Sequence, residues 1–369
     1  MKEKGQAPKV VRVAGTMSGT SLDGVDVAVI ETDGHKIHGF GETRYRPYSD
    51  EEREVLRAAL GKWQGQDGVA EAAEIVERAH IEVLSELEGI ELIGFHGQTL
   101  SHDPDQLRTH QAGNGEVLAD HFGIPVVWDF RTLDMRLGGQ GAPLAPFYHW
   151  ACAAHIGATE PLAFLNLGGV GNLTWIDPSK SKPDADGALL AFDTGPANAP
   201  MDDVIFQRSA QRFDKDGALA AKGRPDEPIL NAFLKRQYFS KIPPKSLDRD
   251  AFADLVDLVG VLSDADAMAT LAACAAGSVV RGFEHFPKPP AFLLVGGGGR
   301  KNPVLMRMLG ALLDIPVLPV EEAGFDGDAF EAQAFAHLAQ RVRLGLSTSA
   351  PGTTGVRAAI GSGQLAEPL

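Results

Sequence analysis

Apolar residues along the chain form short and long runs, and each kind predicts a different element. Short runs with little polar content, at residues 10–14 and 25–31, predict two strands separated by a polar stretch. The same order of strand, polar turn and strand returns at residues 163–167 and 172–176. The repetition predicts two lobes of similar plan rather than a short-period repeat.

Longer segments carry apolar residues at helical spacing. Helices are expected at residues 67–88, 264–286 and 328–343, and further strands at 92–95, 125–128, 291–295 and 316–320. The alternation predicts α/β layers with largely parallel central strands. A chain of 369 residues is long enough for two cores, and we expect the boundary near residues 140–160.

Two polar stretches are typical of connections within a domain. Residues 179–187 are rich in Lys, Pro and Asp and predict the tip of a hairpin. Residues 345–355 predict a solvated loop. Neither stretch resembles a linker between domains.

The charge balance excludes several classes of partner. Lys and Arg total 34 against 49 Asp and Glu, a net charge of −15, and such an acidic surface repels nucleic acid and anionic lipid. The two cysteines allow at most one disulfide, which indicates a reducing compartment. The sequence shows neither a signal peptide nor an apolar run long enough for a membrane span, so we expect a cytoplasmic protein.

Three glycine-rich loops stand out as candidate ligand sites. The first, at residues 15–26, has three glycines and four hydroxyl residues, and such a loop forms a concavity of N–H donors suited to phosphate. The second lies at residues 165–172, between strands. The third, at residues 294–300, has four consecutive glycines, which let a ligand ring lie on the backbone. Close packing explains one such loop, but three favour a nucleotide held between lobes.

The three loops resemble those of the superfamily of acetate and sugar kinases, heat-shock ATPases and actin. Eight motifs follow one another in the order seen in anhydro-N-acetylmuramic acid kinases: MSGTSLDGVD (17–26), FHGQT (95–99), DFR (129–131), GGQGAPL (138–144), LNLGGVGN (165–172), FDTGPANAPMDD (192–203), GGGG-x-x-NP (296–303) and GD-x-x-EA-x-AFA (327–336). The ordered set spans nearly the whole chain. It resembles that family specifically, although each motif alone is modest.

The resemblance implies an α/β, two-lobed actin-like ATPase fold, with ribonuclease H-like duplicated domains and a central nucleotide cleft. The first lobe, residues 1–150, would carry the first phosphate loop and the sugar-binding segments. The second, residues 151–369, would carry the second phosphate loop, a catalytic Asp and the adenosine loop. The implied reaction opens 1,6-anhydro-N-acetylmuramic acid with water and phosphorylates O6, giving N-acetylmuramic acid 6-phosphate and ADP in murein recycling. ATP and Mg²⁺ are the implied cofactors, and a homodimer is the implied assembly.

The nucleotide is expected to contact glycines and their neighbours in the three loops. These residues are Gly19, Thr20, Ser21, Leu22, Asp23, Gly24, Val25, Asp26, Asn166, Gly168, Gly169, Gly296, Gly297 and Gly298. Other superfamily members commonly begin each phosphate loop with Asp, where this chain has Met17 and Asn166. Magnesium ligands therefore cannot be copied from those relatives. Asp26 is the metal candidate, with Asp23 as an alternative, and water is expected to supply most ligands.

Asp193 is the candidate general base. Glycoside hydrolysis ordinarily needs an acid and a base, but phosphoryl transfer to O6 can replace the acid, so one strong base suffices. Asp193 ends an apolar stretch and precedes Thr194-Gly195-Pro196, which can hold it rigidly. The alternatives are a turn cap or the Asp-Thr-Gly of an aspartic protease. The protease needs two such carboxylates, and no second Asp-Thr-Gly or Asp-Ser-Gly occurs.

The candidate sugar ligands are His96, Gln98, Asp129, Arg131 and Glu331. The amide of Gln98 has a donor and an acceptor for a sugar hydroxyl or acetamido group. Arg131 could pair bidentately with the lactyl carboxylate of a muramic acid. The alternatives are a structural histidine at position 96, and an ion pair of Arg131 with Asp129 or Asp134. Glu331 matches an acidic position of the family but also suits a helix N-terminus.

Two rival functions use the same loops. A plain sugar kinase would phosphorylate a free hydroxyl and need no hydrolytic water. A nucleotide-gated binding protein, in the manner of actin or heat-shock ATPases, would hydrolyse ATP slowly without dependence on sugar. Two observations speak against the second rival. The chain shows no obvious peptide-binding appendage, and a binding protein of this kind would give Asp193 no role.

Overall fold

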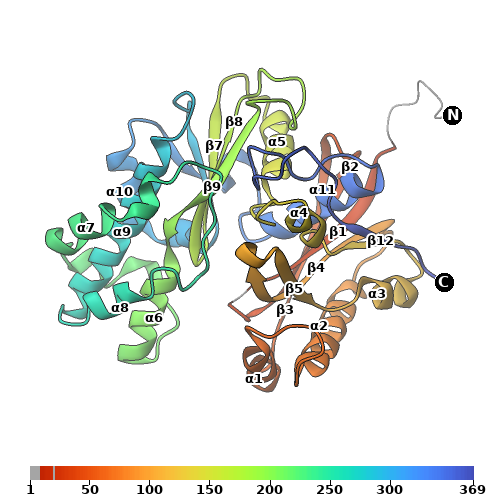
Figure 1. Cartoon of the computed structure of the whole chain (residues 1–369), viewed down its shortest axis with the longest axis horizontal. Helices are drawn as coiled ribbons and strands as arrows, with labels where there is room; N and C mark the ends of the chain where they lie inside the picture. Colours follow the sequence, from red (N-terminus) through yellow and green to blue (C-terminus); the bar gives the residue numbers. More distant parts are fainter. Residues whose placement is uncertain (1–8, 20) are drawn as a thin grey trace. The chain divides into compact units, whose positions relative to one another are not determined.

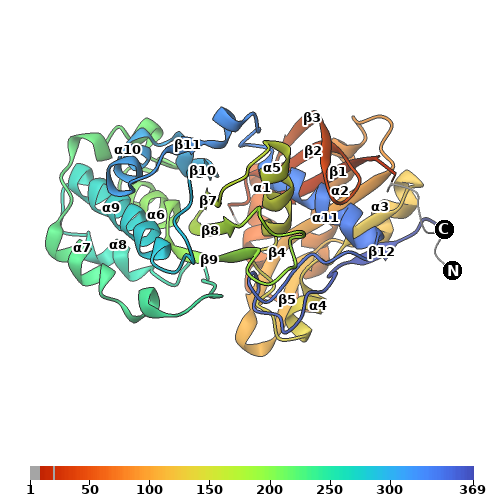
Figure 2. The same cartoon turned by 90° about the horizontal axis from the view of Figure 1, so that it is seen from above.

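The computed structural model describes residues 9–19 and 21–369. They form two compact units, of which unit 1 comprises the chain up to Gly157 together with Ala329–Leu369, and unit 2 comprises Ala158–Asp328. Each unit is an α/β structure built on one mixed sheet (Figures 1 and 2). Within the described residues, no helix combines the length and the apolar character needed to cross a membrane.

The elements of unit 1 are strands β1 (Val11–Ser18), β2 (Gly24–Thr32), β3 (Ile37–Pro47), β4 (Leu92–Asp103), β5 (Arg108–Ala112), β6 (Val126–Trp128) and β12 (Gln364–Ala366), with helices α1 (Asp50–Ala59), α2 (Val69–Leu84), α3 (Gly115–Phe122), α4 (Thr132–Arg136), α5 (Pro146–His155) and α11 (Phe330–Arg343) and the 3₁₀ turn η1 (Pro104–Gln106).

The elements of unit 2 are strands β7 (Leu162–Leu167), β8 (Val170–Ile176), β9 (Leu189–Pro196), β10 (Leu293–Gly296) and β11 (Val317–Pro319), helices α6 (Asn198–Ser209), α7 (Glu227–Leu234), α8 (Asp254–Leu258), α9 (Asp264–Phe283) and α10 (Pro303–Leu312), and 3₁₀ turns η2 (Lys215–Gly217), η3 (Ala220–Lys222), η4 (Gln237–Ser240), η5 (Gly298–Lys301) and η6 (Val320–Ala323).

The two sheets share one topology. In unit 1 the order is β12-β6-β4-β1-β2-β3, with β5 beside β4, and in unit 2 it is β11-β10-β7-β8-β9. In each, the first three strands (β1–β3 and β7–β9) form an antiparallel meander, and two later strands (β4 and β6, or β10 and β11) extend it in parallel from the first strand. In unit 1, β5 and β12 add antiparallel neighbours. This duplicated plan confirms the predicted α/β fold class with two similar lobes. The prediction of largely parallel central strands holds for β6, β4 and β1 and for β11, β10 and β7. Strands β2, β3, β8 and β9 pair antiparallel, because short turns return the chain directly into antiparallel neighbours.

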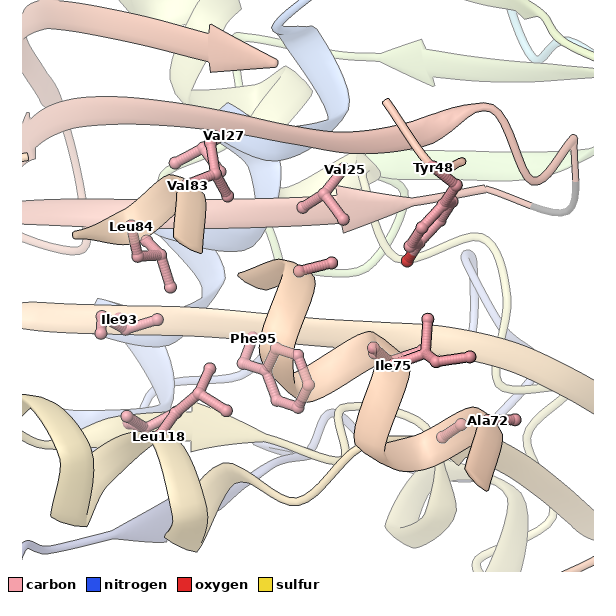
Figure 3. Close-up of a cluster of buried hydrophobic side chains, with 14 of the residues drawn as sticks. Val25, Val27, Tyr48, Ala72, Ile75, Val83, Leu84, Ile93, Phe95 and Leu118 are labelled. Atoms are coloured by element: carbon pink, nitrogen blue, oxygen red, sulfur yellow. The ribbon is translucent and has the colours of Figure 1, made fainter. Parts of the chain in front are cut away.

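One face of the unit 1 sheet packs against α2 and α3. Figure 3 shows Val27 of β2 and Ile93 and Phe95 of β4 turned toward side chains of α2, such as Val83. Successive strand residues point to opposite faces, so Gly94, between Ile93 and Phe95, lies on the other face. The alternation fixes the register of β4 in the sheet.

The other face of the unit 1 sheet packs against α11. A Cβ atom on Gly15 of β1 would lie 1.9 Å from the carbonyl oxygen of Ala332, and one on Gly94 would lie 2.3 Å from that of Phe335. Only glycine allows a helix backbone to come this close to a strand. The C-terminal residues therefore belong to unit 1, and the predicted second lobe of residues 151–369 differs from unit 2 in this respect.

The core of unit 2 fixes the strand that carries Asp193. Helices α9 and α10 cover the sheet with side chains that include Val279 and Leu305, which pack with Leu173 of β8 and Phe192 of β9. Phe192 is fully buried, directly before Asp193. Burial of a phenylalanine side chain stabilises the fold by about 2 to 3 kcal/mol, so this strand end has little freedom to move.

Candidate active site

The first glycine-rich loop is shorter than predicted. β1 extends to Ser18 and β2 begins at Gly24, so the turn itself covers residues 19–23. Thr20 lies outside the described residues. The predicted loop over residues 15–24 therefore includes part of a strand, because antiparallel pairing continues through its polar residues.

The backbone of this turn is tightly constrained. The N–H of Leu22 donates to the carbonyl of Gly19 at 3.1 Å, and Leu22 takes a left-handed φ of 55° while its side chain is buried. A Cβ on Gly24 would lie 2.4 Å from the carbonyl oxygen of Arg46. Val25 is also buried in the core. A nucleotide contact from Leu22 or Val25 would therefore come from the backbone.

The acidic residues of the turn do not form a metal cage. Ser21 donates to Asp23 Oδ1 at 2.7 Å, and both residues are exposed. Asp26 is half-buried in β2, opposite Met17. Within the part of the chain that the structure describes, no group of three or more His, Cys, Asp or Glu side chains could hold a metal ion.

Gln98 fastens the turn to the neighbouring strand. Its side chain is fully buried; its Oε1 accepts a hydrogen bond from Ser18, and its Nε2 donates to the carbonyls of Gly19 at 3.1 Å and Thr99 at 3.3 Å. Ser18 also lies 3.1 Å from the Tyr48 hydroxyl, and burial raises the pKa of Tyr48 to about 12. The amide predicted to meet the sugar therefore holds the first loop in place.

His96 and Arg131, two of the predicted sugar ligands, are in direct contact. His96 Nδ1 donates to the carbonyl of Gly97 at 2.7 Å, which leaves Nε2 to accept from Arg131 at 3.0 Å. Burial lowers the pKa of His96 well below its usual value, and the Arg131 charge lowers it further. A neutral ring is the form that can accept from a guanidinium. Arg131 also donates to the carbonyl of Gly141 at 2.6 Å.

The other two predicted sugar ligands are placed differently. Asp129 has a left-handed φ of 49°, and its carboxylate accepts from the N–H of Thr132 at 3.3 Å and from Gln364 Nε2 at 2.7 Å. It thus accepts from the first N–H of α4 and binds the C-terminal strand. Glu331 is exposed in the first turn of α11, beside the residue that packs on β1.

The second and third glycine-rich loops come together in unit 2. Gly296 of β10 pairs with Asn166 of β7 in the parallel ladder. A Cβ on Gly297, which has a φ of 72°, would lie 2.3 Å from Asn166 Oδ1 and 2.7 Å from the Leu167 carbonyl oxygen. A Cβ on Gly299 would lie 2.6 Å from the Leu167 side chain. Glycine is therefore required for the two loops to be in contact.

Three further glycines present their backbone toward solvent. Gly168 is half-buried, while Gly169 and Gly298 are exposed, and a Cβ at any of them would be 3.5 Å or more from its neighbours. Packing does not demand glycine at these positions. Bare backbone there is suited to a ligand that lies against it, which fits the adenosine and phosphate contacts predicted for these residues.

The second loop also caps α6. Its carbonyls at Gly168 and Gly169 accept from the N–H groups of Asn198 at 2.9 Å and Ala199 at 3.2 Å. Asn198 Nδ2 donates to the carbonyl of Leu167 at 2.8 Å. These bonds satisfy helix N–H groups that have no partner inside the helix. The loop is thus fixed to the corner that follows Asp193.

Asp193 lies beside the second loop and is held by three hydrogen bonds. It pairs with Asn172, the last residue of that loop, across the β8–β9 ladder at a register shift. Its N–H donates to the carbonyl of Lys245 at 2.9 Å, its carbonyl accepts from the Tyr238 hydroxyl at 2.6 Å, and its Oδ2 accepts from the N–H of Leu247 at 2.7 Å. Bulges of this kind often aim a side chain at an active site.

The segment that holds Asp193 contains a buried lysine. Lys245 Nζ donates to the Tyr238 carbonyl at 3.2 Å and lies 3.3 Å from His285 Nε2 and 4.7 Å from the centre of the Tyr238 ring. Burial, with the charges of Arg281 and Lys241, lowers the pKa of Lys245 to about 8. Burial and the Asp193 charge raise the pKa of Tyr238, which therefore stays a hydrogen-bond donor.

The family follows from comparison with known proteins. The profile of the family described as "Anhydro-N-acetylmuramic acid kinase" matches residues 11–367. The proteins of that name from Cereibacter sphaeroides and Ruegeria sp. (strain TM1040) are 62% and 61% identical to this chain, over 96% and 97% of it and 95% of each relative. The chain belongs to the anhydro-N-acetylmuramic acid kinase family. It is thus an ATP-dependent sugar kinase of murein recycling, which confirms the prediction from the ordered motifs.

Among solved structures, the ligand-bound xylulose kinase from Lactobacillus acidophilus is 11% identical. The alignment covers 97% of this chain and 94% of that one, with a TM-score of 0.44. A likeness at this level does not bear on the activity.

In this anhydro-N-acetylmuramic acid kinase, sequence reasoning missed the basic and aromatic residues around Asp193. Tyr238 and Lys245 lie more than 40 positions along the chain from it. Arg249 was missed as well, and its side chain lies near the position of a Cβ on Gly169. A weak signal was available, since Lys245 and Arg249 stand four positions apart in a polar segment.

Arg249 forms an ion pair with Asp203, which lies on α6. Its guanidinium donates to Asp203 Oδ1 at 2.6 Å and to Asp250 Oδ1 at 3.0 Å. Burial, reinforced by the charge of Asp203, raises the pKa of Asp202 to about 7. The second loop thus lies near a cation and a carboxyl group that titrates close to neutral pH.

We expect Gly297→Ala to weaken ATP binding. The methyl group would displace Asn166 or the Leu167 carbonyl, and φ is left-handed, so the KM for ATP should rise about tenfold or more. Steady-state kinetics with varied ATP measures this. Gly310→Ala is the control: α10 leaves open space there, so kinetics should not change and stability should rise by about 0.5 to 1 kcal/mol. An unchanged KM in Gly297→Ala would contradict the prediction.

We expect Asp202→Asn to change how stability depends on pH. The folded protein holds this proton up to about pH 7, whereas the unfolded chain releases it near pH 4, so the carboxyl group makes the free energy of unfolding fall as pH rises between these values. The variant lacks this loss, and its stability relative to the parent should rise by roughly 2 to 4 kcal/mol from about pH 4 to about pH 8. Urea unfolding measures this. A constant difference for Asp202→Asn across this range would sink the assignment.

Proposed function

We propose that this kinase opens the internal bridge of 1,6-anhydro-N-acetylmuramic acid with water while it transfers the γ-phosphoryl group of ATP to O6. Water adds to C1, the C1–O6 bond breaks, and O6 forms the new bond to phosphorus. The products are N-acetylmuramic acid 6-phosphate and ADP. The observation that carries the proposal is Asp193, whose main chain is held by two hydrogen bonds and whose carboxylate is held by a third, next to the second glycine-rich loop.

In the proposed mechanism Asp193 is the general base. The N–H of Leu247 binds Oδ2, and the bonds of Lys245 and Tyr238 to its main chain fix the strand position. A positioned carboxylate can take the proton of the attacking water as the C–O bond forms. The leaving O6 needs no protein acid, because its developing charge is captured by phosphorus.

The nucleotide is proposed to lie on glycine backbone. In unit 2, Gly297 and Gly298 would receive the adenosine moiety, and Asn166, Gly168 and Gly169 the phosphates. In unit 1, N–H groups of the turn at residues 19–23, which Gln98 holds, would receive phosphate oxygens. The neighbouring Arg249 adds a positive charge on the side of the second loop.

Mg²⁺ is proposed to reach the site with the nucleotide. The described residues offer no group of three metal ligands. Asp26, the candidate of the first loop, lies half-buried in β2 opposite Met17. These residues fit an ion that keeps several waters and is bound chiefly by phosphate oxygens. When bound, the ion would neutralise charge on the phosphates during transfer.

We propose further that the kinase is located in the cytoplasm and forms a homodimer.

On the sugar side, Arg131 is proposed to bind the lactyl carboxylate. The contacts with His96 and Gly141 fix two of its N–H donors, and a guanidinium has five in a planar fork. Planar, bidentate recognition of a carboxylate is what arginine does best among cationic side chains. Gln98 is proposed to act through the first loop, and Asp129 through the start of α4.

Labelled water tests the reaction itself. Incubation of 1,6-anhydro-N-acetylmuramic acid and ATP in ¹⁸O-water should place the label in the C1 hydroxyl of the product and none in its phosphate. Mass spectrometry of the phosphorylated sugar measures this. An unopened anhydro ring bearing phosphate elsewhere would instead make this chain a plain hydroxyl kinase, and ATP hydrolysis without sugar dependence would favour a nucleotide-gated binding protein.

We expect Asp193→Asn to lose about 10²- to 10⁴-fold in kcat, because an amide cannot accept the proton. The amide keeps an oxygen for the N–H of Leu247, so the fold and the KM for ATP should change little. Steady-state kinetics and thermal melting separate these effects. Asp186→Asn, an exposed acid in the β8–β9 hairpin of the same unit, is the matched control and should keep full turnover. A kcat of Asp193→Asn near that of the parent would remove Asp193 from the mechanism.

A further inference from the structure

Asp134 is a buried carboxyl group of unit 1 that accepts hydrogen bonds from three donors. It lies in α4, and its side chain is completely buried. Oδ1 accepts from the hydroxyls of Ser349 at 2.5 Å and Thr354 at 2.7 Å, and Oδ2 accepts from the N–H of Gly141 at 2.8 Å. A buried carboxyl group with this many donors is a fixed point around which loops are ordered.

The motif at residues 138–144 folds around this carboxyl group. The N–H of Gly139 donates to the Asp134 carbonyl at 2.9 Å and that of Gln140 to the Thr354 carbonyl at 2.8 Å, and Gly141 completes the series. A Cβ on Gly139 would lie 2.2 Å from Asp134 Oδ2. Contact with Asp134 therefore explains why glycine is needed at position 139.

The residue Gly141 connects the Asp134 carboxyl group to Arg131. Its N–H is bound by Asp134, and its carbonyl accepts from Arg131 Nη1 at 2.6 Å. Arg131 Nη2 is held by the neutral ring of His96. The guanidinium is thus supported by a backbone carbonyl and a ring nitrogen, and the carbonyl is itself positioned by a carboxyl group.

The hydroxyl donors come from a segment that the sequence predicts to be solvated. Within residues 345–355, Ser349 and Thr354 are fully buried, and Ser349 pairs its backbone with Ile360. That prediction was wrong, because the partner of both hydroxyls lies more than 200 positions earlier in the chain. The C-terminal segment is thus part of the support for Arg131.

We propose that Asp134 is a positioning residue for sugar recognition, which holds the N–H of Gly141 so that the carbonyl of the same residue orients the Arg131 guanidinium toward the carboxylate of the substrate. The inference rests on the proposed role of Arg131. Asp134 does not touch the sugar and takes no part in proton transfer. Its effect is on affinity for a carboxylate-bearing sugar, through the direction of the guanidinium plane.

The test is Asp134→Asn in the full-length kinase. The amide keeps one oxygen but cannot accept at all three positions, so the N–H of Gly141 loses its support or the hydroxyls lose theirs. The KM for 1,6-anhydro-N-acetylmuramic acid should rise about tenfold, while kcat and the KM for ATP change by less than about twofold. Steady-state kinetics with each substrate varied in turn measures this split.

A second ligand separates positioning from general damage. 1,6-Anhydro-N-acetylglucosamine has the same ring without the lactyl carboxylate, and its Ki as a competitive inhibitor should be the same in the parent and in Asp134→Asn. Equal weakening of both sugars, or loss of kcat with an unchanged sugar KM, would overturn the inference. Asp177→Asn is the control, since Asp177 is a buried carboxylate of unit 2 that accepts from the Ser179 hydroxyl and N–H. It should leave the sugar KM unchanged.

Thr354 gives a milder variant should Asp134→Asn fail to fold. Thr354→Val removes one hydroxyl donor to Asp134 and should raise the sugar KM about threefold, and Thr354→Ser, which keeps the hydroxyl, should restore it. Equal KM values in these two variants would contradict the proposal.

Arg131→Lys distinguishes the two levels of the argument. It keeps the charge but loses the planar fork, so the sugar KM should rise. If it does not, the assignment of Arg131 fails, and the inference about Asp134 fails with it. If Arg131→Lys raises the sugar KM and Asp134→Asn does not, only the positioning role of Asp134 is wrong.

Discussion

Both units depend on close contacts between main-chain segments. These contacts occur at distances that only glycine allows. In unit 1 they seat α11 on the sheet at Gly15 and Gly94, and in unit 2 they join the second and third loops at Gly297. In each case a methyl group would meet backbone or a fixed side chain rather than a flexible one. The loops are therefore shaped before any ligand arrives, which reduces the conformational entropy that binding must cost.

The same rigidity serves the chemistry. The candidate base in unit 2, Asp193, is fixed through its main chain and one carboxylate oxygen. Arg131 of unit 1, the candidate binder of the substrate's carboxylate, is fixed through a backbone carbonyl and a histidine ring. Groups placed in advance gain rate because they need no reorganisation in the transition state. In both units the supporting atoms come from segments far away in the sequence, so each reacting group depends on the whole of its unit.

Local patterns carried much of the fold. Apolar runs located β1, β2, β7 and β8 to within a few residues, and helical spacing located α9 and α11, because each element buries one face. The ordered motifs identified the family, which local patterning alone could not. The antiparallel direction of neighbouring strands was missed, since a strand's own residues do not record the direction of its partner.

The candidate site was predictable in its glycines and in Asp193, but not in the partners of its polar side chains. Gln98 reads as a ligand from its chemistry, yet its amide is bound by Ser18 and the turn. Ser349 and Thr354 read as solvent-facing because they stand in a stretch rich in Ser, Thr and Gly, yet they meet Asp134. Long-range hydrogen bonds of this kind leave no local period in the sequence.

The return of the C-terminal segment to unit 1 has a consequence for how the chain is made. Unit 2 is continuous in sequence, so all of its strands and helices are synthesised before residues 329–369. Unit 1 is split around it: β6 gains its outer neighbour, and Asp134 its hydroxyl donors, only after residues 349–366 have been made. The inserted unit can thus fold before the segment that completes the sheet of unit 1 is synthesised.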